Sequence, residues 1–184
     1  MMPGGHLATS ILLSAGAYAS ARSPELAVGC FLGGFLIDVD HYADYLFFER
    51  QWRRPGPAAF LRYYFTYKIQ KAVLPLHSIE LMTVLTGIAF FRPHPLLVGY
   101  LVGAAMHLVF DILINGDHVL KRRLLFYSFI YRATQEFSAE RLMDTIQVGE
   151  QTGQHPYREF FKWRPPQARR SRRGKAFRTS QRGA

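Results

Sequence analysis

Four long apolar stretches dominate the first two-thirds of the chain, and strongly polar residues interrupt them at only a few positions. The stretches are too long for strands, and most are rich in alanine, leucine and glycine rather than in alternating β-branched residues, so the pattern predicts helices. The predicted helices cover Leu7–Ala21, Leu26–Ile37, about Ala72–Phe91 and Leu96–Ile114, and the third is broken by Pro75, His77 and Glu80. We therefore expect an all-α protein built on a membrane-embedded four-helix bundle.

Less apolar segments divide the rest of the chain. An aromatic and basic insertion, 42–71, separates the second and third predicted helices and is broken by Pro55-Gly56-Pro57. We expect residues 1–120 to form the core with this insertion, 121–161 to add amphipathic helices, and 162–184 to be a disordered basic tail.

The net charge of +10 comes almost wholly from the tail. The chain has 23 Lys and Arg and 13 Asp and Glu, and the tail holds nine of the basic residues and none of the acidic ones. Such a tail is suited to an anionic lipid surface. We do not expect nucleic acid to be the main partner, because Phe177 is the only aromatic residue among the basic ones from Ala168 to Arg182.

The basic residues also indicate how the four helices would lie in a bilayer. If all four cross, Arg22 and Arg92 lie on one side, and the other 21 basic residues lie on the opposite side. This distribution follows the positive-inside rule and puts both termini in the cytoplasm. Only the fourth helix approaches the roughly 20 apolar residues of a spanning helix. A soluble bundle with short buried helices is therefore the alternative.

Glycines recur at a spacing that lets helices pack closely. The pairs Gly29/Gly33 and Gly99/Gly103 each lie on one helix face, as in closely packed membrane helices. The same spacing also occurs at ordinary tight contacts in soluble bundles.

Histidine and aspartate occur near one end of each apolar helix, where burial is costly unless they are paired or bind a metal. Antiparallel helices with short connections bring all these ends together. His107 and Asp111 are four residues apart and share a helix face. The single Cys30 excludes a cysteine-based zinc finger and an intramolecular disulfide. The candidate metal ligands are His6, Asp38, Asp40, His41, His77, His107 and Asp111.

Mixed histidine and carboxylate ligands favour Zn²⁺, with Mn²⁺ or Fe²⁺ as alternatives. A centre of two bridged ions would polarise a phosphoryl or carbonyl oxygen and generate hydroxide at neutral pH. Glu80, three residues after His77, is the candidate general base or an extra ligand. The alternative is that the histidines are hydrogen-bonded core residues and that Asp38, Asp40 and Asp44 are helix-end residues.

These residues resemble the YdjM-like family of bacterial inner-membrane metal-dependent hydrolases and, more distantly, the zinc-dependent phospholipase C proteins. The family pattern has an N-terminal His, Pro-Asp-x-Asp-His at the end of helix two, His-Ser at the start of helix three, and His-x-x-x-Asp in helix four. The resemblance covers roughly residues 1–115. The matching residues here are His6, Asp38-Val39-Asp40-His41, His77-Ser78, and His107 to Asp111.

The chain departs from the family pattern at two places. Ile37 stands where the family usually has proline, and Ala72-Val73 stands where it often has a His-Arg pair. One possible ligand of the family is therefore missing here; either Glu80 compensates or the site holds fewer metal ions, which leaves the metal count and the activity open.

The resemblance implies a membrane-bound hydrolase of phosphoester or lipid-like substrates, with a metal centre at the cytoplasmic end of its bundle. Membrane lipid is the expected partner. Two alternatives are a non-catalytic membrane protein with a structural metal site, and a soluble or peripheral phospholipase-like enzyme. A structural site is closed and four-coordinate, whereas a catalytic site keeps an open position.

Overall fold

The structure is a computed structural model that describes residues 3–66, 68–115, 120–144, 146–147, 155–161 and 169–170. These residues are predominantly helical, which confirms the prediction of an all-α protein. The strands β1 (Ile146–Gln147) and β2 (Arg169–Arg170) form an antiparallel pair of two residues each. Apart from β2, the predicted basic tail lies outside the described residues.

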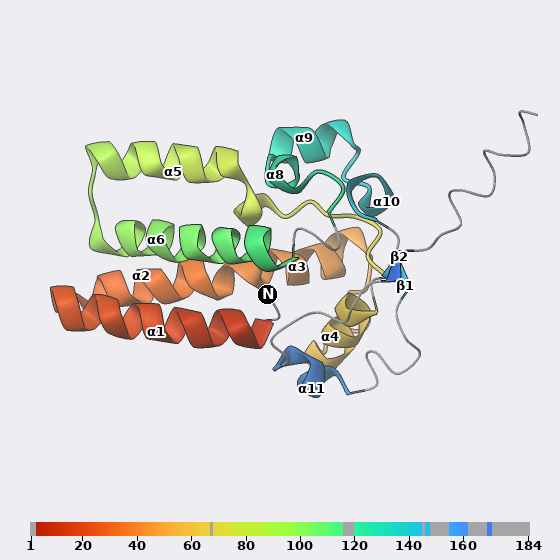
Figure 1. The fold of residues 1–184 in the computed structure, drawn as a ribbon, viewed down its shortest axis with the longest axis horizontal. Helices are drawn as coiled ribbons and strands as arrows, with labels where there is room; N and C mark the ends of the chain where they lie inside the picture. The colour runs from red at the N-terminus through yellow and green to blue at the C-terminus, as the bar shows by residue number, and fades with distance from the viewer. Residues whose placement is uncertain are drawn as a thin grey trace, which may run out of the picture.

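Four long apolar helices lie side by side in one half of the molecule (Figure 1). Their most extensive contacts join α1 to α2, α2 to α6, and α6 to α5. The α1–α2 and α5–α6 connections lie at the same end, far from the shorter helices. The bounds are Pro3–Ala21 for α1, Pro24–Gly34 for α2, Ile79–Phe91 for α5 and Pro95–Phe110 for α6.

Local signals at the helix ends explain where three of these helices begin. Ser23 and Ser78 are N-caps, and their hydroxyl oxygens accept hydrogen bonds from the first turns of α2 and α5. Proline occupies the start of α2 and of α6, where its missing N–H is not needed. These caps favour the observed boundaries because they satisfy N–H groups that have no partner inside the helix.

Helices α2 and α6 approach so closely that their backbones are in contact. A Cβ atom at Gly33 would clash with the carbonyl oxygen of Tyr100, and one at Gly103 would clash with that of Cys30. This contact aligns the ends of the two helices that lead into the candidate ligands. The glycine spacing in the sequence therefore corresponds to a real helix crossing.

The other half of the molecule consists of short helices packed around two hydrophobic clusters, a small one in which Leu61 and Phe65 are buried and a larger core. The buried members of that core are Ala72, Leu74, Phe126, Tyr127 and Leu142. The short α-helices are α3 (Val39–Ala43), α4 (Pro57–Phe65), α8 (Arg123–Phe126), α9 (Phe129–Thr134), α10 (Ala139–Leu142) and α11 (Pro156–Phe160). The remaining elements are the short 3-10 helices η1 (Leu36–Asp38) and η3 (Pro75–His77) and the π-helical segments η2 (Asp44–Phe48) and η4 (Asp111–Asn115).

The third apolar helix begins later than the sequence predicts. Residues 72–78 are not α-helical, and α5 starts only after them. Leu74 has a left-handed backbone with φ 44°, and it precedes Pro75, which disfavours helix at the preceding residue. The carboxylate of Asp44 accepts hydrogen bonds from the N–H groups of Val73 and Leu74 at 2.7 and 3.2 Å. Asp44 therefore replaces the backbone bonds that a helix would have supplied.

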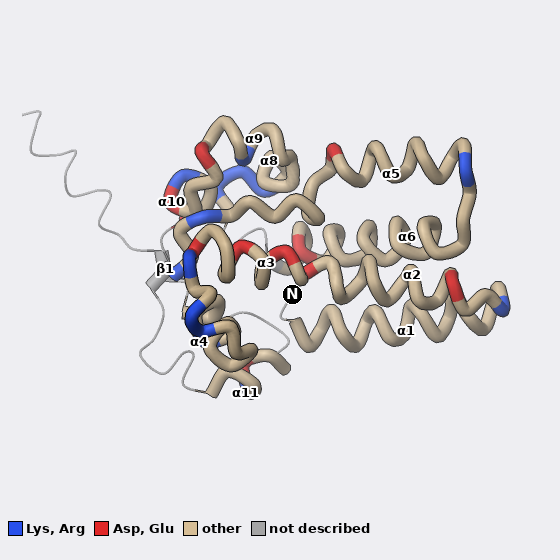
Figure 2. The backbone as a smooth tube through the Cα atoms, turned by 180° about the vertical axis from the view of Figure 1, so that it is seen from behind, with Lys and Arg blue, Asp and Glu red and all other residues tan. Residues whose placement is uncertain are grey.

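One described helix, Pro95–Ile114, is long and apolar enough to cross a membrane. A second would qualify if α2 and the segment Leu36–Phe48, which meet at a 46° bend, were counted together. The core helix of a soluble protein can meet the same criteria. Lys and Arg lie mainly around the short helices, with Arg22 and Arg92 at the opposite end of the molecule (Figure 2).

The helix crossing predicts opposite effects for two glycine substitutions. Gly33→Ala should destabilise the protein by about 1–3 kcal/mol, because the added methyl group overpacks the α2–α6 contact. Gly16→Ala in α1 meets no atom within 4 Å. It should stabilise by up to about 1 kcal/mol through helix propensity. Thermal unfolding of both variants in one detergent checks this, and equal melting temperatures would refute the close crossing.

Candidate metal centre

Two groups of side chains that could hold metal ions lie where the long helices meet the short ones. Within each group the ligand atoms all lie within 4.8 Å of one another. Six of the seven predicted ligands belong to these groups, although they come from six different elements of the fold. The first group is His6, His107 and Asp111, and the second is Asp38, His41 and His77.

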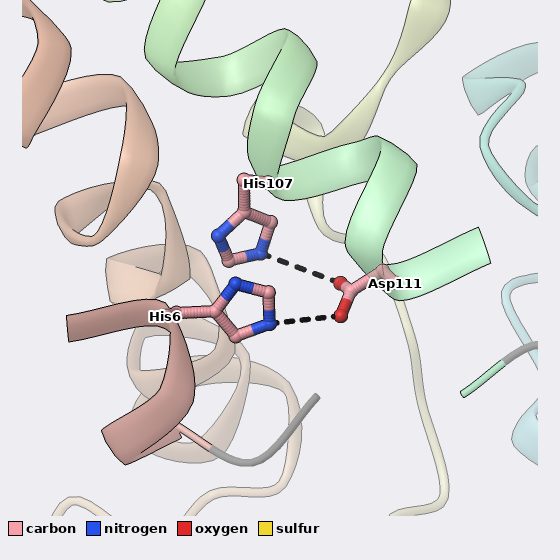
Figure 3. Close-up of side chains that lie close together, drawn as sticks. All are labelled: His6, His107 and Asp111. Carbon is pink, nitrogen blue, oxygen red and sulfur yellow. Dashed lines mark hydrogen bonds and ion pairs between the residues drawn. The ribbon is translucent and has the colours of Figure 1, made fainter. Parts of the chain in front are cut away.

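Asp111 connects the two histidines of the first group, as Figure 3 shows. Its Oδ1 lies 3.0 Å from Nε2 of His6, and its Oδ2 lies 3.3 Å from Nε2 of His107. The two imidazole rings stack with their centroids 3.8 Å apart. Both histidines therefore direct their Nε2 atoms towards the carboxylate of Asp111.

Asp38 is the central residue of the second group and joins it to the first. Its Oδ1 lies 3.4 Å from Nε2 of His77, 3.4 Å from Nε2 of His107 and 3.7 Å from Nε2 of His41. The contact between Asp38 and His107 therefore joins the two groups into one continuous centre. Asp38 would therefore be available as a ligand to an ion held by either group.

In His77 and His107, the hydrogen bond made by Nδ1, the nitrogen that points away from the centre, fixes the protonation of Nε2, the nitrogen that points into it. Nδ1 of His107 lies 2.8 Å from the carbonyl oxygen of Gly34, which can only accept, so Nδ1 donates its proton. Nδ1 of His77 lies 3.0 Å from Oδ2 of Asp40 and donates in the same way. In the neutral rings, each Nε2 then carries a lone pair directed into the centre. This is the orientation that a metal-binding histidine needs.

These lone pairs would repel one another without a cation between them. Nε2 of His77 and Nε2 of His107 are 3.2 Å apart, and the Asp38 carboxylate faces both. Either an added proton or a metal ion can supply the positive charge. Burial by itself lowers the pKa of His77, but the carboxylates of Asp40 and Asp38 outweigh this and raise that pKa to about 9.

The separations between ligand atoms fit a metal ion. In a tetrahedral site with bonds of about 2.0–2.1 Å, neighbouring ligand atoms are about 3.3 Å apart. The contacts of Asp111 with His6 and His107, and those of Asp38 with His77 and His107, range from 3.0 to 3.4 Å. These separations, and the 3.7 Å between Asp38 and His41, are compatible with a His/carboxylate metal site, and the shortest of them are also those of hydrogen-bonded ion pairs.

The structure places Asp40 behind a ligand rather than among the ligands. Its Oδ2 accepts hydrogen bonds from Nδ1 of His77 and from the backbone N–H of Leu76, both at 3.0 Å. The prediction that Asp40 is a direct ligand is therefore replaced by a positioning role. Such a carboxylate fixes the ring orientation and increases the basicity of the histidine that binds the metal.

Glu80 lies outside both groups and caps a helix instead. Its carboxylate accepts hydrogen bonds from the hydroxyl of Ser128 at 2.5 Å and from the N–H groups of Phe129 and Ile130 at 2.8 and 3.2 Å. These groups form the start of α9. The geometry gives Glu80 a structural role, not the role of general base or extra ligand that its spacing from His77 indicated.

Arg132 is a buried residue that the sequence analysis did not single out. Its side chain is fully buried and donates hydrogen bonds to the carbonyl oxygens of Val73, Leu74, His77 and Phe126. Three of these carbonyls belong to the non-helical segment that carries His77. A single arginine in a predicted amphipathic helix gives no signal of this role, because surface arginines occur there as well.

A cavity of about 440 Å³ opens directly beside the centre. Five of the site residues contribute to its wall, namely His6, Asp38, His41, His77 and Asp111. The side chains of Asp38 and His41 are 26% and 18% exposed, so the second group is accessible from this cavity. The centre therefore has an open face next to a space in which another molecule can bind.

Comparison of the chain with known protein families, with curated proteins and with solved structures finds no match. The interpretation of this centre therefore depends on its own geometry.

Asp40 and Glu80 should differ sharply in their effect on metal binding. Asp40→Asn should weaken zinc binding by about 10–100-fold, because His77 loses the carboxylate that orients it. Glu80→Gln should leave zinc affinity unchanged and lower only the stability of the fold. Competition with a chromogenic chelator measures both affinities. Equal losses in the two variants would show that Asp40 has no special role at the centre.

Proposed function

We propose that this protein is a membrane-bound, metal-dependent hydrolase that cleaves a phosphoester or related bond in a lipid-like or membrane-proximal substrate. The observation that carries the proposal is the Asp38 carboxylate, which faces three histidines beside an open cavity. A purely structural metal site is closed and fully ligated by the protein. An accessible carboxylate and histidine at a cavity wall support catalysis over a metal that only joins helix ends.

The two groups of donor atoms suggest which residues would bind each metal ion. His6, His107 and Asp111 would hold one ion, and His41 and His77 a second, with Asp38 between them. When bound, Zn²⁺, or Mn²⁺ or Fe²⁺ in its place, would polarise a phosphoryl or carbonyl oxygen and lower the pKa of a water molecule. Asp40 and the carbonyl of Gly34 would keep the histidine rings in the tautomer that this requires.

The outer surfaces of the long helices support membrane embedding. No residue of α5 is buried, although the helix is almost wholly apolar. The long helices have few charged residues, and the charges at the end far from the metal centre are Arg22, Glu25 and Arg92 (Figure 2). A soluble or peripheral bundle would carry polar residues on these outer faces. The exposed apolar residues include Ile11, Leu12, Val28, Val84, Ile88 and Val102.

The resemblance to the YdjM-like hydrolases agrees with this proposal. The order of the ligands along the chain follows that family, and a bacterial inner-membrane protein with cytoplasmic termini is the corresponding placement. The centre would then lie at the cytoplasmic end of the four apolar helices, where basic residues are abundant. We propose membership of this family on the basis of these residues.

Metal content and hydrolysis together test the proposed activity. The purified wild type should contain about one or two zinc ions per chain and should cleave a chromogenic phosphodiester. His107→Ala and Asp111→Ala should lose both the metal and the cleavage. His94→Ala is the matched control, because His94 lies at the opposite end of α6 and caps that helix. A wild type that contains no metal and gains none from added Zn²⁺ or Mn²⁺ would refute the proposal.

The orientation in the membrane can be tested with single cysteines in a Cys30→Ala background. Arg92 and Arg54 are both exposed, and they lie on opposite sides of the proposed bilayer. In intact bacteria, a membrane-impermeant thiol reagent should label Arg92→Cys but should label Arg54→Cys only after lysis. The reverse pattern, or equal labelling of both variants in intact cells, would contradict the proposed topology.

A further inference from the structure

The cavity beside the metal centre is mainly apolar and aromatic. Among the described residues, the ionisable groups of its wall other than tyrosine are the histidines and aspartates of the centre, and no lysine, arginine or glutamate lines it. Its volume of about 440 Å³ falls in the range of about 300–1,000 Å³ that is usual for ligand pockets. The aromatic residues of the wall include Phe60, Tyr64, Phe65, Phe126, Tyr127 and Phe160.

The cavity also has apolar residues at the surface of the protein. Leu36 and Val39 both line it and are 44% and 53% exposed. They follow directly after α2, where the apolar helices give way to the short ones. In the proposed membrane orientation this position lies near the edge of the bilayer. An apolar chain could therefore pass from lipid into the cavity without crossing water.

The distribution of charge distinguishes two parts of the ligand. Phosphate-binding sites commonly use arginine or lysine, and this cavity wall has neither. The positive charge available to an anionic group is therefore at the metal centre itself. The aromatic wall instead favours binding of an apolar part of the ligand, because that binding removes apolar surface from water.

We propose that the cavity binds one hydrocarbon chain of the substrate while an anionic oxygen group at the end of that chain lies at the metal centre. This inference rests on the proposed function and specifies its substrate class. The substrate would be an anionic phosphoester or related group attached to one hydrocarbon chain. Recognition then depends on the chain more than on the chemistry of a large headgroup. The chain holds the bond that is cleaved next to Asp38 and His41.

Binding of n-alkylphosphonates to the zinc-loaded protein in nanodiscs tests the inference without requiring turnover. Across a series from butyl to dodecyl, the Kd measured by calorimetry should fall about fourfold for each added CH₂ until the cavity is filled. Empty nanodiscs provide the correction for partition into lipid. A Kd that does not depend on chain length after this correction would overturn the inference.

A pair of leucines gives a matched test of where the chain lies. Leu120 lines the cavity, whereas Leu124 is 72% exposed and does not. Leu120→Trp should fill part of the cavity and shift the plateau of the series to shorter chains. Leu124→Trp should leave the series as in the wild type. If both variants behave as the wild type, the chain does not occupy this cavity.

The same samples separate this inference from the proposed function. Dependence on chain length without any hydrolysis of the phosphodiester would support the cavity assignment and contradict the enzymatic proposal. Hydrolysis that requires His107 and Asp111, together with phosphonate binding that ignores chain length, would support the enzyme and refute the cavity assignment.

Discussion

The need for positive charge between closely spaced electron-pair donors, two of them buried histidines, is the constraint on which the rest of this structure depends. The Nε2 atoms of the buried His77 and His107 and the partly exposed Asp38 carboxylate face one another at 3.2–3.4 Å. Such a group is unfavourable unless positive charge lies within it, because burial removes the water that would otherwise solvate it. A proton or a metal ion can supply that charge, and a metal ion would in addition link elements that are distant in the sequence.

Two sets of contacts bring these donors together, and the residues that make them are not candidate ligands. The glycine contact between α2 and α6 sets how the ends of these helices lie relative to each other. Arg132 and Asp44 hold the non-helical segment 72–78 by hydrogen bonds to its backbone, so that His77 faces the centre. The left-handed backbone of Leu74 is tolerated because these bonds compensate its strain.

The long helices and the proximity of six of the seven candidate ligands could be predicted because they depend on local patterns. Apolar runs define helices, and short connections bring their ends to one side. The helix expected over 72–78 was wrong, because Pro75 and the hydrogen bonds from Asp44 outweigh the apolar pattern. The roles of Asp40, Glu80 and Arg132 depend on which atom faces which neighbour across the fold. Spacing along the chain cannot distinguish a ligand from the residue behind it.

The order of the ligands along the chain has a consequence for assembly. His6 and Asp111 meet at the centre although 105 positions separate them. During synthesis, the first group therefore cannot be complete until the chain has been made through Asp111 and α6 has taken its place beside α2. Closing so long a loop has an entropic cost that the metal can offset only at that late stage. Binding of a metal by this group would thus mark the completion of the apolar half, and a chain that stops before Asp111 would have an incomplete set of candidate ligands.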